Sequence, residues 1–223
     1  MKTILFVIVA ALLTASAFAA NEKAAATETN LPVDQAEANY TQAIEKRTAD
    51  ILALLDIADP ANKERVHDTI MAQYRALRIW HDENDAKLKA SAKDTNAVAQ
   101  INATLKTLHD EFLSKLAVNL TPEQIDKVKD KMTYGVVQVT FNAYVKMYPD
   151  LTEAEKKQIM TWLIEARETS MDQGSSDEKH AVFGKYKGRI NNYLSKQGYD
   201  AKTGRKKVTP AETSTPGTNQ PAK

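Results

Sequence analysis

Cysteine is absent from the 223-residue sequence. The chain therefore has no disulfide, no thiolate to bind a metal and no thiol nucleophile. Glycine and proline are also scarce, at seven residues each, and the sequence contains neither a glycine-rich phosphate loop nor a nucleophile elbow. Beyond residue 20, no stretch approaches the roughly 20 apolar residues that a transmembrane helix needs. We therefore predict no catalytic residue, no cofactor and no stable membrane span.

An excess of charge of either sign is lacking as well, because 30 Lys and Arg residues stand against 29 Asp and Glu residues. Such a balance creates no overall field that would attract nucleic acid, so we expect no nucleic-acid partner. The balance is uneven at the C-terminus, where residues 199–223 hold five basic and two acidic side chains. Because this segment is rich in Thr, Pro, Gly and Ala and has little to bury, we predict a disordered basic tail over 199–223.

The N-terminus has the three parts of a secretory signal peptide. Lys2 provides a positive charge, residues 4–13 form an apolar run, and small residues lead up to Ala17 and Ala19. We predict a signal peptide over residues 1–19, with cleavage after Ala17 or Ala19, and hence an exported protein that is periplasmic or secreted. Residues 20–33 are then a flexible leader, and residues 34–198 form one domain of ordinary size.

Apolar residues of this domain recur at spacings of three and four, which is typical of helices with one buried face. The predicted helices cover residues 34–56, 61–90, 95–118 and 134–148. Further helices begin where a Ser or Thr is followed three residues later by Gln or Glu, which is the pattern of a capping box. These starts lie at Thr121, Thr152 and Ser175. We therefore predict an all-α fold, a single helical-bundle domain of about six to seven helices with flexible tails.

The stretch 134–148 carries two conflicting signals. Val136, Val137, Val139 and Thr140 are β-branched, which favours a strand. The apolar residues of this stretch nevertheless trace one helical face, and no partner strand is evident elsewhere in the sequence. We therefore predict a helix here.

Residues 120–124, Leu-Thr-Pro-Glu-Gln, resemble the LTxxQ motif of the periplasmic helical proteins Spy and CpxP. A weaker echo follows at residues 151–155, where Glu155 stands in place of the Gln. The same pentapeptide is also a good helix start in its own right. The resemblance implies a non-enzymatic chaperone or signalling role in envelope stress, with unfolded clients or other envelope proteins as partners.

A longer resemblance covers most of residues 38–200. The runs that carry it are Tyr74–Leu77, Met132–Val137, Gly174–His180 and Phe183–Leu194. In these runs the chain is similar to a family of exported bacterial proteins catalogued only as a domain of unknown function, which is common in bacteria that degrade complex polysaccharides. The resemblance implies an extracytoplasmic helical domain without an assigned activity, a role in carbohydrate utilisation, and glycans as possible partners.

His81 and Asp85 lie one helical turn apart and could share a metal ion with Glu83. A zinc site needs three or four converging ligands, whereas a helix face of this composition is commonly solvated. His67, His109 and His180 lie on three different predicted helices, and no metal-binding motif is present. We therefore predict no metal site.

The segment 184–193 combines basic and aromatic residues with two glycines. Gly184 and Gly188 lie on one helical face, and each costs about 1 kcal/mol against alanine in a helix interior. We therefore expect something to pack closely there, either another helix or an anionic or sugar ligand in a groove. Trp162 and Trp80 are possible stacking platforms for that ligand, although both also fit the apolar core stripe, which is the preferred interpretation. The candidate ligand-binding residues are Trp162, Lys185, Tyr186, Arg189, Asn192 and Tyr193.

Two classes of function remain open from the sequence. One is a non-enzymatic periplasmic interaction or chaperone-like protein, which the LTxxQ resemblance and the charged amphipathic helices favour. The alternative is a carbohydrate-linked binding protein or enzyme with a site near residues 162–193. The first is slightly preferred, and an enzymatic activity is the less favoured expectation.

Overall fold

A computed structural model describes residues 33–206. The predicted signal peptide, all of the leader except Val33, and residues 207–223 lie outside the described residues. The chain divides into two compact units, residues 1–44 and residues 45–223. Helix α1 (Val33–Leu52) begins in the first unit and ends in the second. The packing discussed below is that of residues 45–206.

Seven helices occupy the described residues, which confirms the predicted all-α fold. After α1 they are α2 (Pro60–Ala90), α3 (Thr95–Ala117), α4 (Pro122–Met132), α5 (Val136–Met147), α6 (Glu153–Met171) and α7 (Ser176–Lys196). None of them is both long enough and apolar enough to cross a membrane. The first helix ends four residues earlier than predicted, and the chain soon reaches Asp56, whose φ of +49° is incompatible with a continuing right-handed helix.

The predicted helix starts are confirmed in atomic detail. At Thr121, Thr152 and Ser175 the hydroxyl accepts a hydrogen bond from the backbone N–H three residues later. The Gln or Glu at that later position accepts one from the N–H of the capping residue in return. Each reciprocal pair satisfies two backbone groups that have no partner within the helix.

The stretch with conflicting signals forms helix α5. Its buried residues Val137, Thr140 and Tyr144 follow one another at helical spacing on a single face, and α5 packs against α6. The difference in intrinsic helix propensity between β-branched residues and alanine is only about 0.7 kcal/mol per residue or less. Burial of whole side chains is worth about 1.5–3 kcal/mol each and decides the outcome.

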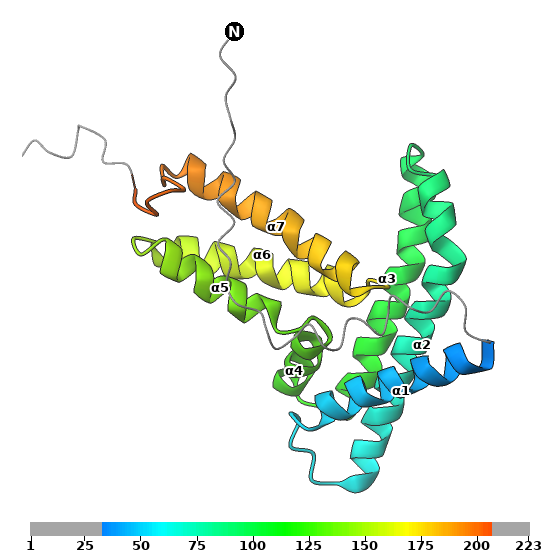
Figure 1. Cartoon of the computed structure of the whole chain (residues 1–223). Coiled ribbons are helices and arrows are strands. Elements are labelled where there is room, and N and C mark those ends of the chain that lie inside the picture. Colours follow the sequence, from blue (N-terminus) through cyan, green and yellow to red (C-terminus); the bar gives the residue numbers. More distant parts are fainter. Residues whose placement is uncertain (1–32, 207–223) are drawn as a thin grey trace, which may run out of the picture. The chain divides into compact units, whose positions relative to one another are not determined.

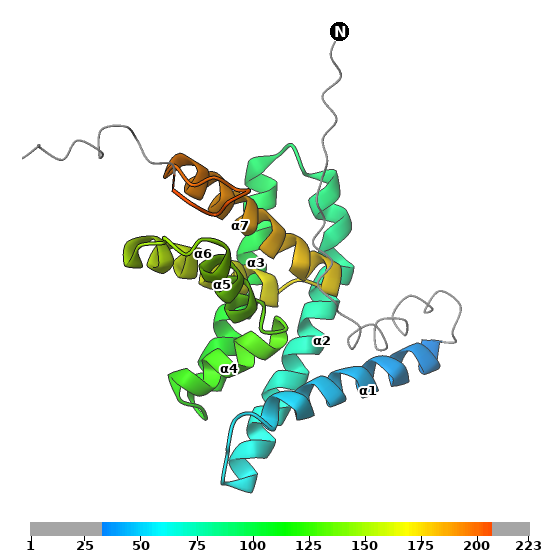
Figure 2. The same ribbon diagram turned by 60° about the vertical axis from the view of Figure 1, so that its left-hand side comes forward.

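Helices α5, α6 and α7 lie side by side, and α2 and α3 form a long antiparallel hairpin (Figures 1 and 2). The core between α5, α6 and α7 is built from aliphatic and aromatic side chains that are almost wholly buried. Its innermost members are Ile159, Leu163, Ala166, Phe183, Ile190 and Leu194. The hairpin is connected to this group at the turn between α6 and α7, through the polar contacts described below.

Helix α4 is held to α6 by a buried guanidinium group. Arg167 of α6 is only 6% exposed. Its Nη1 donates to Asp130 Oδ1 at 2.8 Å, and its Nη2 donates to Asp126 Oδ1 at 2.6 Å. Two carboxylates one turn apart on α4 therefore compensate a charge that would be costly to bury alone.

The ordered domain extends beyond Gly198, the predicted end, to residue 206. Tyr199 is buried, and its hydroxyl donates to Asp150 O at 2.8 Å and to Glu155 Oε2 at 2.9 Å. The chain then turns back, so that Tyr199 and Lys206 form an antiparallel bridge. The prediction of disorder from residue 199 thus does not hold for its first eight residues, because a single aromatic anchor and its polar partners outweigh the composition of the segment.

Gly204 lies at the tightest point of this C-terminal turn. Its φ is +67°, and a Cβ atom at this position would lie 1.8 Å from Met147 O. Gly188 differs in both respects, since it is in the interior of α7 and a Cβ there would meet nothing within 4 Å. Of these two glycines, only Gly204 is therefore required by the fold.

We expect Gly204→Ala to lower the free energy of unfolding by about 1–3 kcal/mol, because it adds both a clash and backbone strain. Gly188→Ala should raise that free energy by up to about 1 kcal/mol, because alanine is the better helix former. Urea denaturation of the two variants measures both effects. Equal changes in the two variants would show that the close approach at Gly204 is wrong.

Candidate functional site

Trp80 and His81 lie side by side on α2 and are each fixed by a hydrogen bond. Trp80 Nε1 donates to Thr104 Oγ1 of α3 at 2.8 Å. His81 Nδ1 lies 2.9 Å from Asp85 Oδ1, one helical turn further along α2. The two rings meet edge to face, with 5.0 Å between their centroids. The spacing of His81 and Asp85 that the sequence displays therefore produces a direct contact between them.

The turn between α6 and α7 covers the other side of the His81 ring. His81 Nε2 lies 2.8 Å from Asp172 O, and because a carbonyl only accepts, this nitrogen is the donor. A Cβ at Gly174 would lie 3.0 Å from His81 Cγ, so the absence of a side chain lets the turn approach the ring. Both ring nitrogens of His81 thus face oxygen atoms, one from its own helix and one from a residue 91 positions away.

A pocket of about 230 Å³ opens beside these residues. Its walls come from α2, α3, the turn between α6 and α7, and the first turn of α7. Apolar surfaces alternate in it with carboxylate, amide, ammonium and imidazole groups. The lining residues are Trp80, His81, Asp85, Leu88, Lys89, Asn102, Leu105, Gln173 and Glu178. We refer to it as the His81 pocket.

Asp172, whose backbone contacts His81, is also bonded through its side chain. Its Oδ2 lies 2.7 Å from His109 Nδ1 of α3. This hydrogen bond raises the pKa of His109, and the nearby negative charges act in the same direction. Burial raises the pKa of Asp172, although the contact with His109 opposes that change. The second carboxylate oxygen, Oδ1, is buried and has no hydrogen-bond partner among the described residues.

The polar network continues from His109 toward α4. Glu168 Oε2 lies 3.6 Å from His109 Nε2 and accepts a hydrogen bond from Lys129 Nζ at 2.8 Å. The other oxygen of Glu168 contacts Arg167. Alternating charges therefore run from His109 to α4 across the inside of the domain. Among residues 33–206, no group of three His, Asp or Glu side chains is placed to hold a metal ion.

Lys179 is the buried cation of α7. Its Nζ donates to Met132 O at 3.0 Å and to Met171 O at 3.4 Å, the last residues of α4 and α6. Carbonyl groups at helix C-termini attract positive charge. Burial nevertheless lowers the pKa of Lys179 to about 8, and the positive charge of Arg47 acts in the same direction.

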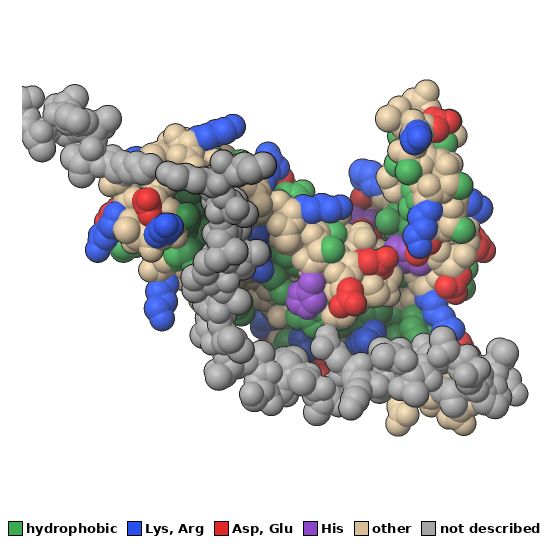
Figure 3. All heavy atoms as spheres, turned by 45° about the horizontal axis from the view of Figure 1, so that its top comes forward, with side chains coloured by type: hydrophobic (Ala, Val, Ile, Leu, Met, Phe, Trp, Pro, Cys, Tyr) green, Lys and Arg blue, Asp and Glu red, His purple; other side chains and the backbone are tan. Residues whose placement is uncertain are grey.

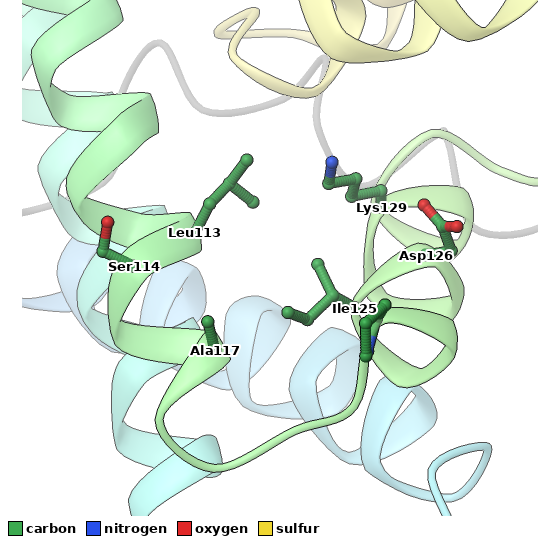
Figure 4. A pocket seen from close by; sticks show the side chains of 7 residues that line it. Leu113, Ser114, Ala117, Ile125, Asp126 and Lys129 are labelled. Carbon is green, nitrogen blue, oxygen red and sulfur yellow. The ribbon is translucent and has the colours of Figure 1, made fainter.

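A second pocket, of about 420 Å³, lies between α3 and α4. Leu113 and Ile125 face each other across it, with Asp126 and Lys129 at one side (Figure 4). Both of these charged groups already take part in ion pairs, with Arg167 and Glu168. Its remaining lining is mostly apolar, so it offers fewer polar groups to a ligand than the His81 pocket.

The structure brings three of the six candidate residues on α6 and α7 together. The guanidinium carbon of Arg189 lies 4.5 Å from the centre of the Trp162 ring, and the edge of that ring meets Tyr193. Arg189 Nη1 also donates to Glu165 Oε2 at 3.2 Å. One face of the indole is therefore covered by the chain's own arginine.

The structure does not bring the other three candidate residues into this cluster. Tyr186 packs against the core, whereas Lys185 and Asn192 are exposed. The expected close packing at Gly184 and Gly188 is wrong for the described residues, because a Cβ at either glycine would meet nothing within 4 Å. Both glycines lie on the exposed side of α7.

The contacts through Asp172 were not predictable from local sequence patterns. His109 lies 63 residues from Asp172, and His81 lies 91 residues from it. Residues this far apart in sequence form no local pattern that could be recognised. Only the tertiary fold therefore shows that Asp172 contacts both histidine rings. The His81–Asp85 spacing was the single local signal of the site.

We expect stability to depend on pH through Lys179. An ordinary lysine titrates near pH 10.5, so between about pH 8 and pH 10.5 the folded state binds fewer protons than the unfolded chain. The free energy of unfolding therefore rises with pH over this window. Urea denaturation should show wild type gaining stability relative to Lys179→Met as the pH rises from 8 to 10.5. Lys185→Met, at an exposed position, serves as the control. If wild type gained as much stability relative to Lys185→Met as relative to Lys179→Met, the pH dependence would not come from Lys179.

A family model described as "Protein of unknown function (DUF3826)" matches residues 41–210. No curated protein matches the sequence. The match covers well over half of the chain, including every residue of the His81 pocket and its polar network. The chain belongs to the DUF3826 family.

Proposed function

We propose, for a chain whose family carries no assigned activity, that this protein binds a small polyhydroxylated ligand of the saccharide class in the His81 pocket. The observation that best supports the proposal is the convergence of apolar walls with several kinds of polar group in one depression. Ligand sites combine mostly apolar linings with a few placed polar groups. The proposal concerns binding and assigns no reaction to the pocket.

The chemistry of the lining suits sugar hydroxyls. A hydroxyl both donates and accepts hydrogen bonds. Asp85 and Glu178 supply acceptors, Lys89 supplies donors, and the amides of Asn102 and Gln173 supply both. A polyol can use such a mixture, whereas a purely anionic or cationic ligand would face a like charge on one side.

The size of the pocket limits what it can hold. Its volume of about 230 Å³ is below the roughly 300–1,000 Å³ of typical ligand pockets. One ring of an oligosaccharide is therefore the expected occupant, with the rest of the chain outside. So few ligand atoms support only modest affinity, and a dissociation constant of about 1 mM corresponds to about −4 kcal/mol.

The test is a thermal-shift screen with monosaccharides, uronic acids and oligosaccharides, followed by titration of any ligand that stabilises the protein. Asn102→Ala removes one hydrogen-bonding side chain from the pocket and should weaken binding by about 2- to 10-fold. Asn192→Ala is the matched control, because it makes the same change on an exposed helical position beside the Trp162–Arg189 cluster.

If no ligand at about 100 mM shifted the unfolding temperature, the proposal would be contradicted, since even a ligand with a dissociation constant of about 1 mM would then stabilise the fold by about 2.7 kcal/mol. Loss of binding in Asn192→Ala but not in Asn102→Ala would move the site to the cluster on α6 and α7.

A second candidate function is interaction with unfolded or partner proteins, and the exposed face of α5 favours it. Val139 is 70% exposed and Met147 is 54% exposed, and with the exposed Ala143 they follow one another at helical spacing. Apolar side chains also lie among charged ones on the face of the protein that Figure 3 shows. Exposed apolar surface of this kind occurs at protein interaction sites.

We expect Val139→Ser to reduce the ability of the protein to suppress aggregation of a heat-unfolded client enzyme, because it removes apolar surface from the centre of this face. Val118→Ser is the control, since Val118 is 81% exposed but follows α3. Light scattering at near-stoichiometric ratios measures the effect. No suppression by wild type would refute a chaperone-like role.

Export is part of the proposal. The N-terminal signal peptide predicted from Lys2, residues 4–13 and the small residues before Ala19 supports it. N-terminal sequencing of protein recovered from the envelope or the culture fluid tests this, and an intact Met1 there would contradict cleavage.

A further inference from the structure

We propose that His109 and Asp172 are positioning residues of the His81 pocket, and that protonation of His109 strengthens the pocket's geometry. Neither side chain lines the pocket. Their influence runs through the turn between α6 and α7, which Asp172 begins. The inference rests on the proposed function only where it concerns ligand affinity, since its structural part requires no ligand.

Asp172 connects two imidazole rings by different groups. Its carboxylate Oδ2 lies 2.7 Å from His109 Nδ1, and its backbone O lies 2.8 Å from His81 Nε2. The next two residues are Gln173, which lines the pocket, and Gly174, which approaches the His81 ring. A displacement of Asp172 would therefore move the pocket wall and one of the two contacts that orient His81.

The charges around His109 favour its cationic form. Asp172 faces Nδ1, and Glu168 of α6 lies 3.6 Å from Nε2. Lys129 of α4 acts against protonation, but it is bonded to Glu168 at 2.8 Å. The net result is a pKa of His109 raised above its usual 6.5, with the hydrogen bond to Asp172 as the largest cause.

Within residues 33–206, Asp172 has no other strong partner, and its buried Oδ1 has no hydrogen bond. Lys179 of α7 contributes a favourable charge but donates its hydrogen bonds to Met132 O and Met171 O. The negative charge of Glu168 of α6 repels the Asp172 carboxylate. On the side of α2, Asp172 contacts His81 only through its backbone oxygen. His109 is therefore the principal group that compensates this carboxylate.

The direction of the pH dependence follows from these contacts. Below the pKa of His109 both ring nitrogens carry protons, so one donates to Asp172 and the other points toward Glu168. When the pH rises through that pKa, a neutral ring faces two carboxylates with a single donor. A group with a raised pKa in the folded state contributes its stabilisation at lower pH and loses it as the pH rises. The stabilisation of the turn is thus fully present below about pH 6.5 and is lost as the pH rises through the raised pKa of His109.

Trp80 offers a direct readout, because its ring centroid lies 5.0 Å from that of His81 and the chain has only two tryptophans. In a Trp162→Phe background, Trp80 is the sole indole fluorophore. We would titrate its fluorescence from about pH 5 to about pH 9, the range in which histidines change charge. A step with its midpoint above pH 6.5 is expected from His109, and the His109→Gln variant identifies it.

His109→Gln keeps a donor for Asp172 that does not titrate, so this step should disappear. His67→Gln is the control, because the pKa of His67 is also raised, chiefly by its hydrogen bond to Asp68, yet it contacts no residue of the pocket. A step that persists in His109→Gln, or that vanishes equally in His67→Gln, would overturn the inference. Circular dichroism verifies that each variant is folded.

Asp172→Asn provides the second variant if His109→Gln does not fold. It retains the backbone contact with His81 and removes the charge, so the step should be lost or move to lower pH, and its persistence at the same midpoint would equally overturn the inference. If the step depends on His109 while no saccharide binds, the positioning role stands and the proposed function fails. If a saccharide binds with equal affinity at pH 6 and pH 8.5 and the step is absent, the positioning role alone fails.

Discussion

A carboxylate buried where α6 ends constrains how the helices of this domain come together. An ionised group in a protein interior costs several kcal/mol unless other groups compensate its charge. For Asp172 the compensation comes from His109 of α3 and, at longer range, from Lys179 of α7. The backbone of the same residue holds His81 of α2. Helices that are remote in sequence must therefore meet at this one position.

Arg167 imposes a similar constraint on the other side of α6. Its guanidinium is 6% exposed and relies on two carboxylates of α4. Apolar burial drives α5, α6 and α7 together without specifying their neighbours, since it is non-directional. The charged contacts add direction, because each requires particular atoms at hydrogen-bonding distance. In this domain the two kinds of interaction are complementary: one supplies cohesion, and the other selects the partners of α6.

Most of the helices were predictable because the signals that determine them are local. A capping box occupies four consecutive positions, and helical periodicity repeats within a window of about 11–18 residues. The turn at residues 199–206 was missed, since its order depends on Tyr199 reaching Asp150 and Glu155, about 50 residues earlier. The composition of a segment indicates how much apolar surface it can bury, but it does not show whether a distant residue is placed to bond with it.

The candidate site was less accessible to sequence reasoning for the same physical reason. Trp162, Arg189 and Tyr193 lie together, but the arginine covers one face of the indole. Gly184 and Gly188 looked like marks of close packing and are open instead. The type of a residue limits which contacts it can make, whereas only the fold determines which neighbours it contacts.

The C-terminal turn also bears on the order in which the domain can assemble during synthesis. Glu155 is buried early in α6, and burial opposes its ionisation, while hydrogen bonds from Thr152 and Tyr199 lower its pKa. Tyr199 and Lys206, two of its partners, follow it by 44 and 51 residues. Domains generally fold as units as the chain emerges from the ribosome. Helix α6 must therefore wait until residues 199–206 have been made before this buried acid has its full set of partners.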